Sequence, residues 1–236
     1  MEKYLYLILN IATLLFPLLW SFESKVRYAK KWFALFPAIF FTAALYLAWD
    51  QWFTVMGVWG FNEKYLTGIY LGSLPLEECL FFIIVPFSTI FIYEVLQFYF
   101  PQRPTVSITK GITLLLIGVL VVIGILNLDK WYTGVNFTLV ALLLAIHYYF
   151  FRDKILGRFY VFYLVHLIPF LLFNGTLTGA FTSEPVVFYD DAENLGLRVF
   201  TIPIEDFIYS MGLMLMNISI YEKIKQRKTI QSPLGL

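Results

Sequence analysis

Residues 73–78 read SLPLEE and residues 201–206 read TIPIED, and each segment opens an apolar stretch long enough to cross a membrane. From position 73 to position 201 the separation is 128 residues, and Tyr93-Glu94 matches Tyr221-Glu222 at the same separation. Self-similarity of this kind predicts a chain built from two copies of one structural unit. The two motifs therefore mark corresponding helix starts in the two halves.

The composition around the motifs is that of a membrane protein. Of the 236 residues, 60% are hydrophobic and only 14% are charged, whereas about a quarter of the residues of a soluble domain are charged. Windows of about 20 residues predict seven transmembrane helices in an all-α membrane protein. They are Tyr4–Phe22, Trp32–Phe53, Pro75–Phe98, Gly111–Asn127, Val135–Phe151, Arg158–Phe173 and Ile202–Tyr221.

Charge and rare residue types exclude several classes of protein. The 17 Lys and Arg residues nearly balance the 16 Asp and Glu residues, so nucleic acid is not expected as a partner. The single cysteine, Cys79, excludes an intrachain disulfide and a Cys-based metal cluster. The acidic run at 189–193 lacks the DDxxD spacing of a metal–diphosphate site, and no metal site is predicted.

The distribution of basic residues predicts the orientation in the membrane. Most Lys and Arg residues follow the first, third and fifth predicted helices or lie in the C-terminal tail. The positive-inside rule places these segments in the cytoplasm, so the N-terminus is expected outside and the C-terminus inside. The opposite side carries only Lys3, Lys64, Lys130 and Arg198.

The repeat predicts the organisation of the chain. We expect a first three-helix repeat at 1–110, a spacer helix with its connection at 111–134, a second three-helix repeat at 135–222 and a basic cytoplasmic tail at 223–236. Because an even number of crossings separates the two repeats, they are expected to be parallel, with a pseudo-two-fold axis along the membrane normal. Just upstream of the motifs, FN at 61–62 and LTG at 66–68 recur as FN at 173–174 and LTG at 177–179.

Each motif supplies two acids at a helix start, Glu77 with Glu78 and Glu205 with Asp206. One acid per copy is explained by capping, because a carboxylate in the first turn stabilises the positive end of the helix dipole. Successive helix residues point about 100° apart, so the second acid is expected to face the bundle. Ionisable residues at membrane depth are functional by default. The motifs therefore predict at least one acid per half with a role beyond capping.

Three further acids differ in their expected roles. Asp50 lies at the same membrane level as the motifs, and an interfacial role is an equally good alternative for it. Glu94 and Glu222 follow 17 residues after Glu77 and Glu205, which is about 25 Å along a helix. They are expected to be interfacial or packing residues. His147 and His166 stand in apolar surroundings and are predicted to be core residues.

The run WDQWFTVMGVWGFNEKYLTGIYLGSLPLEECLFF at 49–82, with its echo LFNGTLTG at 172–179 and TIPIEDFIYS at 201–210, resembles the membrane-integral, non-flavin lycopene cyclases. Those cyclases occur as two bacterial subunits, as one fused chain, or as a domain of fungal phytoene synthase/lycopene cyclase, and this chain is similar to the fused bacterial form. The resemblance implies cyclisation of the linear ψ ends of lycopene to β-ionone rings, giving γ-carotene and then β-carotene, in carotenoid biosynthesis. It also implies a bacterial inner membrane protein whose partners are lycopene and the lipid bilayer.

The resemblance also implies the site. Acid and base are expected among Glu77, Glu78, Glu205, Asp206 and Asp50, with the division between them open. No G-x-G-x-x-G fingerprint is present, and no cofactor is expected. Aromatic faces can stabilise a carbocation, and the expected substrate-binding residues are Asn62, Asn174, Trp49, Trp59, Phe81 and Tyr209.

One alternative function stays open. Paired intramembrane acids and repeats are also features of transporters, so a small proton-coupled membrane carrier is the second interpretation. Within the cyclase interpretation, the sequence leaves open whether one or both ends are cyclised, whether the ring is β or ε, and whether the substrate is lycopene or a related acyclic carotenoid. It also leaves the oligomeric state open.

Overall fold

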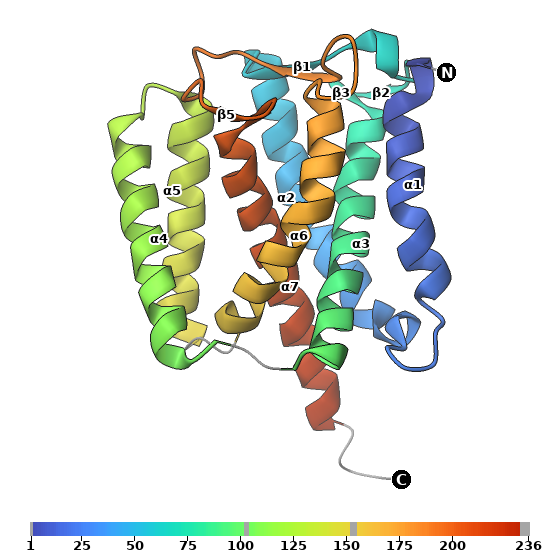
Figure 1. Cartoon of the computed structure of the whole chain (residues 1–236), viewed down its shortest axis with the longest axis vertical. Coiled ribbons are helices and arrows are strands. Elements are labelled where there is room, and N and C mark those ends of the chain that lie inside the picture. The colour runs from blue at the N-terminus through green and yellow to red at the C-terminus, as the bar shows by residue number, and fades with distance from the viewer. Residues whose placement is uncertain (1, 102–103, 152–154, 232–236) are drawn as a thin grey trace.

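The computed structural model describes residues 2–101, 104–151 and 155–231, so the end of the predicted basic tail, 232–236, lies outside it. The described residues form seven long α-helices that run side by side in alternating directions (Figure 1). They are α1 (Leu5–Trp20), α2 (Trp32–Met56), α3 (Leu76–Tyr99), α4 (Val106–Leu126), α5 (Trp131–Ile146), α6 (Leu156–Leu177) and α7 (Ile204–Gln231).

Six of the described helices, α1 to α6, are long and apolar enough to cross a membrane by length and composition. The seventh, α7, is 28 residues long, but Glu205, Asp206 and Asn217 interrupt its apolar sequence. All three of these polar side chains are buried. The chain is therefore a helical membrane protein whose most polar long helix lies inside the bundle.

Helix α4 begins at Val106, earlier than predicted. The reason is an N-cap, because the Thr105 hydroxyl accepts a hydrogen bond from the Ile108 amide at 3.4 Å. Because some residues between Val106 and Gly111 are polar, the hydrophobic windows predicted a start one turn too late. The hydrophobic windows thus found this helix but not its first turn.

Helices α5 and α6 are also longer than predicted at the end near the motifs. Helix α5 begins at Trp131 instead of Val135, and α6 ends at Leu177 instead of Phe173. The predicted loop residue Asn174 therefore lies inside α6. Hydrophobicity alone misplaces these ends because the added turns contain the polar residues that face other protein segments.

The two long connections form a cap at the end of the bundle that also holds the N-terminus, whereas α7 ends at the opposite end (Figure 1). Each connection contains an antiparallel hairpin, and a third antiparallel strand pair joins the two connections. The hairpins are β2 (Tyr70–Leu71) with β3 (Leu74–Pro75) and β5 (Arg198–Val199) with β6 (Ile202–Pro203), and the joining pair is β1 (Trp59–Phe61) with β4 (Val187–Tyr189).

Contacts within the cap recur between residues that are 128 positions apart, which is also the separation of the motifs. Strand β4 lies 128 residues after β1, so each strand pairs with its own counterpart. The Asn62 amide donates to the Val186 carbonyl at 2.8 Å, and the Asp190 amide donates to the Val58 carbonyl at 2.9 Å. Reciprocal contacts of this type are those of a two-fold relation between the halves.

These contacts correct one predicted match between the halves. Asn62 follows strand β1 in the cap, whereas Asn174 lies inside helix α6. The residue that makes the contacts corresponding to those of Asn62 is Asp190. The FN and LTG recurrences therefore pair positions that are not equivalent in the fold.

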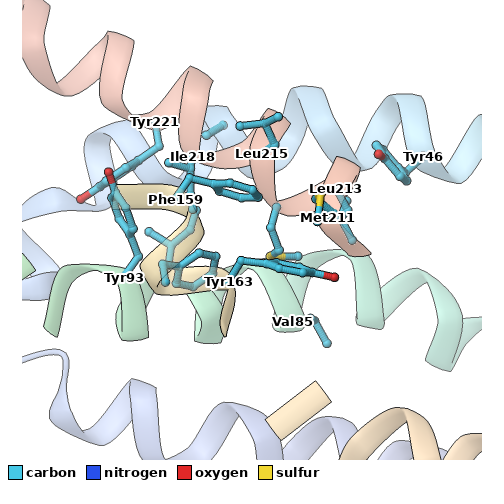
Figure 2. Packing of buried hydrophobic residues seen from close by; sticks show 14 of the residues in the cluster. Tyr46, Val85, Tyr93, Phe159, Tyr163, Met211, Leu213, Leu215, Ile218 and Tyr221 are labelled. Carbon is cyan, nitrogen blue, oxygen red and sulfur yellow. The ribbon is translucent and has the colours of Figure 1, made fainter. Parts of the chain in front are cut away.

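The largest buried cluster joins α2, α3, α5, α6 and α7. Figure 2 shows part of it, including Phe159 of α6 and Leu215 and Ile218 of α7. Because lipid is as apolar as these side chains, helices in a membrane associate through close packing and hydrogen bonds more than through hydrophobic burial. The polar contacts of the cap and of the helix starts therefore matter for the position of each helix.

Candidate functional site

The first acid of each motif fixes the cap to a helix start. Glu77 and Glu205 are fully buried. The Thr67 amide donates to Glu77 Oε1 at 2.7 Å, and the Leu195 amide donates to Glu205 Oε1 at 2.8 Å. Glu205 Oε1 also accepts a hydrogen bond from the Thr133 hydroxyl at 2.7 Å. These carboxylates thus hold the loop that precedes their helix, with donors 10 residues upstream in both halves.

The second acid of each motif, Glu78 or Asp206, points between the helices and accepts a hydrogen bond from a tyrosine. Tyr6 of α1 donates to Glu78 Oε2 at 2.6 Å, and Tyr132 of α5 donates to Asp206 Oδ1 at 2.6 Å. Hydrogen bonds to a carboxylate are short and about twice as strong as neutral ones. Each second acid is therefore held by the first helix of its own half.

A cavity below the cap brings both second acids together. Its volume, counted with the space at its opening, is about 900 Å³. Asp50, Glu78 and Asp206 all line it, and Glu78 interacts electrostatically with each of the other two carboxyl groups. The rest of the wall is largely aromatic, with Trp59, Phe61, Phe81, Phe170, Phe173 and Tyr209 among its residues.

Four of the residues predicted to bind substrate line this cavity, namely Trp59, Phe81, Asn174 and Tyr209. Asn62 does not, because its side chain lies in the cap and donates to Glu184 Oε2 at 3.2 Å. Trp49 lies behind Tyr209, with ring centroids 5.0 Å apart. Asn62 and Trp49 are thus not among the residues that line this cavity, and their contact with substrate stays a prediction.

Sequence reasoning missed the two tyrosines that hold the acids. A signal was present, because residues 6–10 (YLILN) and 132–136 (YTGVN) share a Y-x-x-x-N pattern that places both side chains on one helix face. The Asn10 amide group donates to the Glu77 carbonyl at 2.9 Å, and that of Asn136 donates to the Glu205 carbonyl at 2.8 Å. The separation here is 126 residues instead of 128, which concealed the match.

Asp206 has two further donors. The Asn174 amide group donates to Asp206 Oδ2 at 2.6 Å, and the Tyr189 hydroxyl, from strand β4, donates to the same oxygen at 2.8 Å. Burial and the neighbouring Asp206 carboxylate raise the pKa of Tyr189 well above its ordinary value. Its hydroxyl therefore keeps its proton and acts as a donor. No motif in the sequence pointed to Tyr189.

His166 also lines the cavity, although it was predicted to be a core residue. It is buried, and its Nε2 lies 2.9 Å from the hydroxyl of Ser210, which lines the same cavity. In the described part of the chain, no group of three or more His, Cys, Asp or Glu residues is placed to hold a metal ion. The polar chemistry of the cavity is thus that of carboxyl, hydroxyl, amide and imidazole groups.

At the opposite end of the bundle, Glu94 and Glu222 form an ionic network. Glu94 pairs with both Lys31 and Lys225 and accepts a hydrogen bond from the Tyr221 hydroxyl at 2.7 Å. Lys225 also pairs with Glu222 at 3.2 Å. These acids lie far along their helices from the cavity, where the network joins α3 and α7 to Lys31, the residue that precedes α2.

Replacing Glu94 with Gln is expected to lower the stability of the protein by about 2 kcal/mol, because Lys31 and Lys225 lose a buried anionic acceptor. Thermal unfolding in detergent measures this change. Glu63→Gln, at an exposed position of the cap, is the matched control and should leave the midpoint unchanged. Equal midpoints for both variants would show that the network contributes nothing to stability.

Comparisons with known proteins agree with this architecture. The chain matches the family model described as lycopene cyclase in two segments, residues 3–96 and 129–224. The first segment covers α1 to nearly the end of α3, and the second begins just before α5 and extends into α7. A search of curated proteins and a search of solved structures found no match.

Proposed function

Since the chain belongs to the lycopene cyclase family, we propose that it is a lycopene β-cyclase that works by acid/base catalysis without a cofactor. Its substrate is lycopene, and its products are γ-carotene and then β-carotene. The observation that carries this proposal is the presence of Glu78 and Asp206 in one aromatic cavity. The acid and the base of a cyclisation need to reach the same end of one substrate.

The proposed reaction is redox-neutral and balances in protons. A carboxylic acid of the site protonates the terminal double bond of the ψ end. The next double bond attacks the resulting cation, and one carbon–carbon bond closes the ring. A carboxylate then removes a proton from the ring carbon next to the new cation, which leaves the double bond of the β-ionone ring. One proton enters and one leaves for each ring.

The cavity wall suits the cationic intermediate. Trp59, Phe81 and Tyr209 present aromatic rings to the same space as the carboxyl groups. A cation over an aromatic face is stabilised by about 2 kcal/mol or more where water is excluded. The proposed roles are therefore acid/base chemistry for Asp50, Glu78 and Asp206, and cation stabilisation for the aromatic rings. For Glu77 and Glu205 we propose positioning roles, because their carboxylates hold the cap.

We also propose that all seven helices cross a bacterial inner membrane, with the cap outside. Two parallel three-helix repeats, α1–α3 and α5–α7, would be joined by α4 as a spacer. The reciprocal strand pairing of β1 with β4 supports this arrangement, and so do the two separate matches to one family model. The basic residues near the opposite end support a cytoplasmic location for that end.

Expression in a bacterial host that accumulates lycopene tests the proposed function. We expect conversion to γ-carotene and β-carotene at unchanged molecular mass, identified by chromatography and mass spectrometry. The purified protein in lipid should perform the same conversion without added flavin or nicotinamide. Unchanged lycopene with well-inserted protein would contradict the proposal, and proton-driven uptake by vesicles would then favour the carrier. An ε ring would correct the product while keeping the reaction class.

A further inference from the structure

The two carboxyl groups of the cavity have related but unequal surroundings. Glu78 and Asp206 occupy corresponding positions, 128 residues apart, and each is bound by a tyrosine at 2.6 Å. If the halves were strictly equivalent, the remaining contacts of the two acids would also correspond. They differ, and two of the differences change the number of hydrogen-bond donors beside Glu78 or Asp206.

The first difference is between Asp50 and Asn174. These residues occupy corresponding places, because each directly follows an aromatic residue whose ring packs on the third helix of the other half. The ring pairs are Trp49 with Tyr209 at 5.0 Å and Phe173 with Phe81 at 5.8 Å. Beside Asp206 the position holds an amide that donates a hydrogen bond, whereas beside Glu78 it holds a second carboxyl group.

The second difference is between Phe61 and Tyr189, which end strands β1 and β4 at the 128-residue separation. Tyr189 donates its hydroxyl hydrogen to Asp206 at 2.8 Å. Phe61 lines the cavity together with Glu78 but has no hydroxyl to donate. The cap therefore supplies a hydrogen-bond donor to Asp206, whereas near Glu78 it supplies the ring of Phe61, which has no hydroxyl.

Together these differences favour opposite protonation states for Glu78 and Asp206. Asp206 accepts hydrogen bonds from Tyr132, Asn174 and Tyr189, and three donors stabilise a carboxylate anion. The described residues give Glu78 one donor, the Tyr6 hydroxyl.

Asp50, the neighbour of Glu78, is buried and has the Trp59 side chain as a hydrogen-bond donor, but its Oδ2 has no hydrogen-bond partner in the described part of the chain. Two adjacent carboxyl groups in an apolar cavity disfavour double ionisation. A proton held between Asp50 and Glu78 relieves the repulsion between their two carboxyl groups. Asp206 does not need such a shared proton.

We propose that the two halves have different catalytic roles, with Glu78, backed by Asp50, donating the proton to the substrate and Asp206 removing the proton from the ring. Asn174 and Tyr189 are the positioning residues that keep Asp206 ionised and aimed at the cavity. This assignment rests on the proposed function. After each ring closes, the proton from Glu78 stays in the product and Asp206 carries a proton taken from the ring carbon, and exchange with water restores both groups.

Deuterium labelling separates the two roles. The wild-type protein in D₂O should add one deuterium for each ring formed. Asp206→Asn should still protonate the substrate, so deuterium should enter acyclic pigment, ring isomers or water-captured products while β-rings fall at least tenfold. Glu78→Gln should incorporate none. The reverse pattern, or loss of deuterium from both variants, would overturn the assignment.

A mirror pair of variants tests the positioning residues. Asp50→Asn with Phe61→Tyr gives Glu78 the donors that Asp206 has, and kcat should fall at least tenfold with little change in KM. Tyr189→Phe should instead raise the share of ring isomers among the products. Phe61→Leu, which adds no donor, is the control for packing, and size-exclusion chromatography confirms folding of every variant.

The outcomes of these assays distinguish the two proposals. Wild-type kcat in Asp50→Asn/Phe61→Tyr, or unchanged products in Tyr189→Phe, would overturn the division of roles alone. Failure of the wild-type protein to cyclise any carotenoid would overturn the proposed function itself. A fall of kcat in Phe61→Leu equal to that in the double variant would assign the effect to packing and also contradict the division of roles.

Discussion

Glu78→Gln is expected to lower the rate of lycopene conversion about a thousandfold, which is the usual contribution of a positioned general acid. The amide has nearly the shape of the acid and keeps an acceptor for the Tyr6 hydroxyl, which donates to Glu78 in the native protein. It cannot deliver a proton to a carbon–carbon double bond. Pigment analysis of membranes that contain equal amounts of inserted protein measures the loss.

Two controls accompany this variant. Tyr6→Phe removes the hydrogen bond to Glu78 but leaves the acid, so its loss of activity should be much smaller than that of Glu78→Gln. Glu63→Gln changes an exposed carboxylate of the cap and should convert lycopene as the native protein does. A Glu78→Gln protein with native turnover would remove Glu78 from the mechanism.

Gly212→Leu is expected to destabilise the bundle by about 3 kcal/mol or more, the upper part of the range for overpacking a filled core. A Cβ at Gly212 would lie 2.8 Å from Val140 Cγ2 and 2.9 Å from the Tyr46 hydroxyl oxygen. Both neighbours are fully buried, so neither side chain has space to move away. The yield of monodisperse protein and the thermal midpoint in detergent should both fall.

Gly118→Leu is the matched control for this prediction. Gly118 lies on the exposed side of α4, and a Cβ there would meet nothing within 4 Å. The same substitution at this exposed position of α4 should therefore leave the thermal midpoint unchanged. If both variants have the same thermal midpoint as the native protein, the close approach of α7 to α2 and α5 does not limit the packing of the bundle.

The sequence predicted the helices and the acidic motifs because both depend on local chemistry. Each of the seven apolar windows corresponds to a described α-helix, and six of these helices are long and apolar enough to cross a membrane. Backbone groups in a membrane must be satisfied within each segment. The doubled motif also directed attention to Glu78 and Asp206. Its 128-residue separation recurs in the backbone contacts of Glu77 and Glu205.

Contacts between distant segments could not be predicted in the same way. Tyr189 reaches Asp206 only because β4 pairs with β1, and short strands in a cap carry no periodic signal. Asn62 and Asn174 were matched because each follows a phenylalanine in the sequence. Asn62 lies in the cap, however, and Asn174 lies in α6. Trp49 was expected to face the substrate, but the direction of a ring in a helix rich in aromatics depends on its neighbours.

The pairing of β1 with β4 also sets an order of events during biosynthesis. Because the N-terminal half is synthesised first, α3 and its Glu78 are formed before β4 exists. Until Tyr189 has been synthesised and β4 has paired with β1, the cavity lacks the part of its wall that Val187 and Tyr189 form. A carbocation formed in such an open site would be captured by water. A nascent chain that stalls after α4 lacks both β4 and Asp206, so the cavity is complete only when the second half has been synthesised.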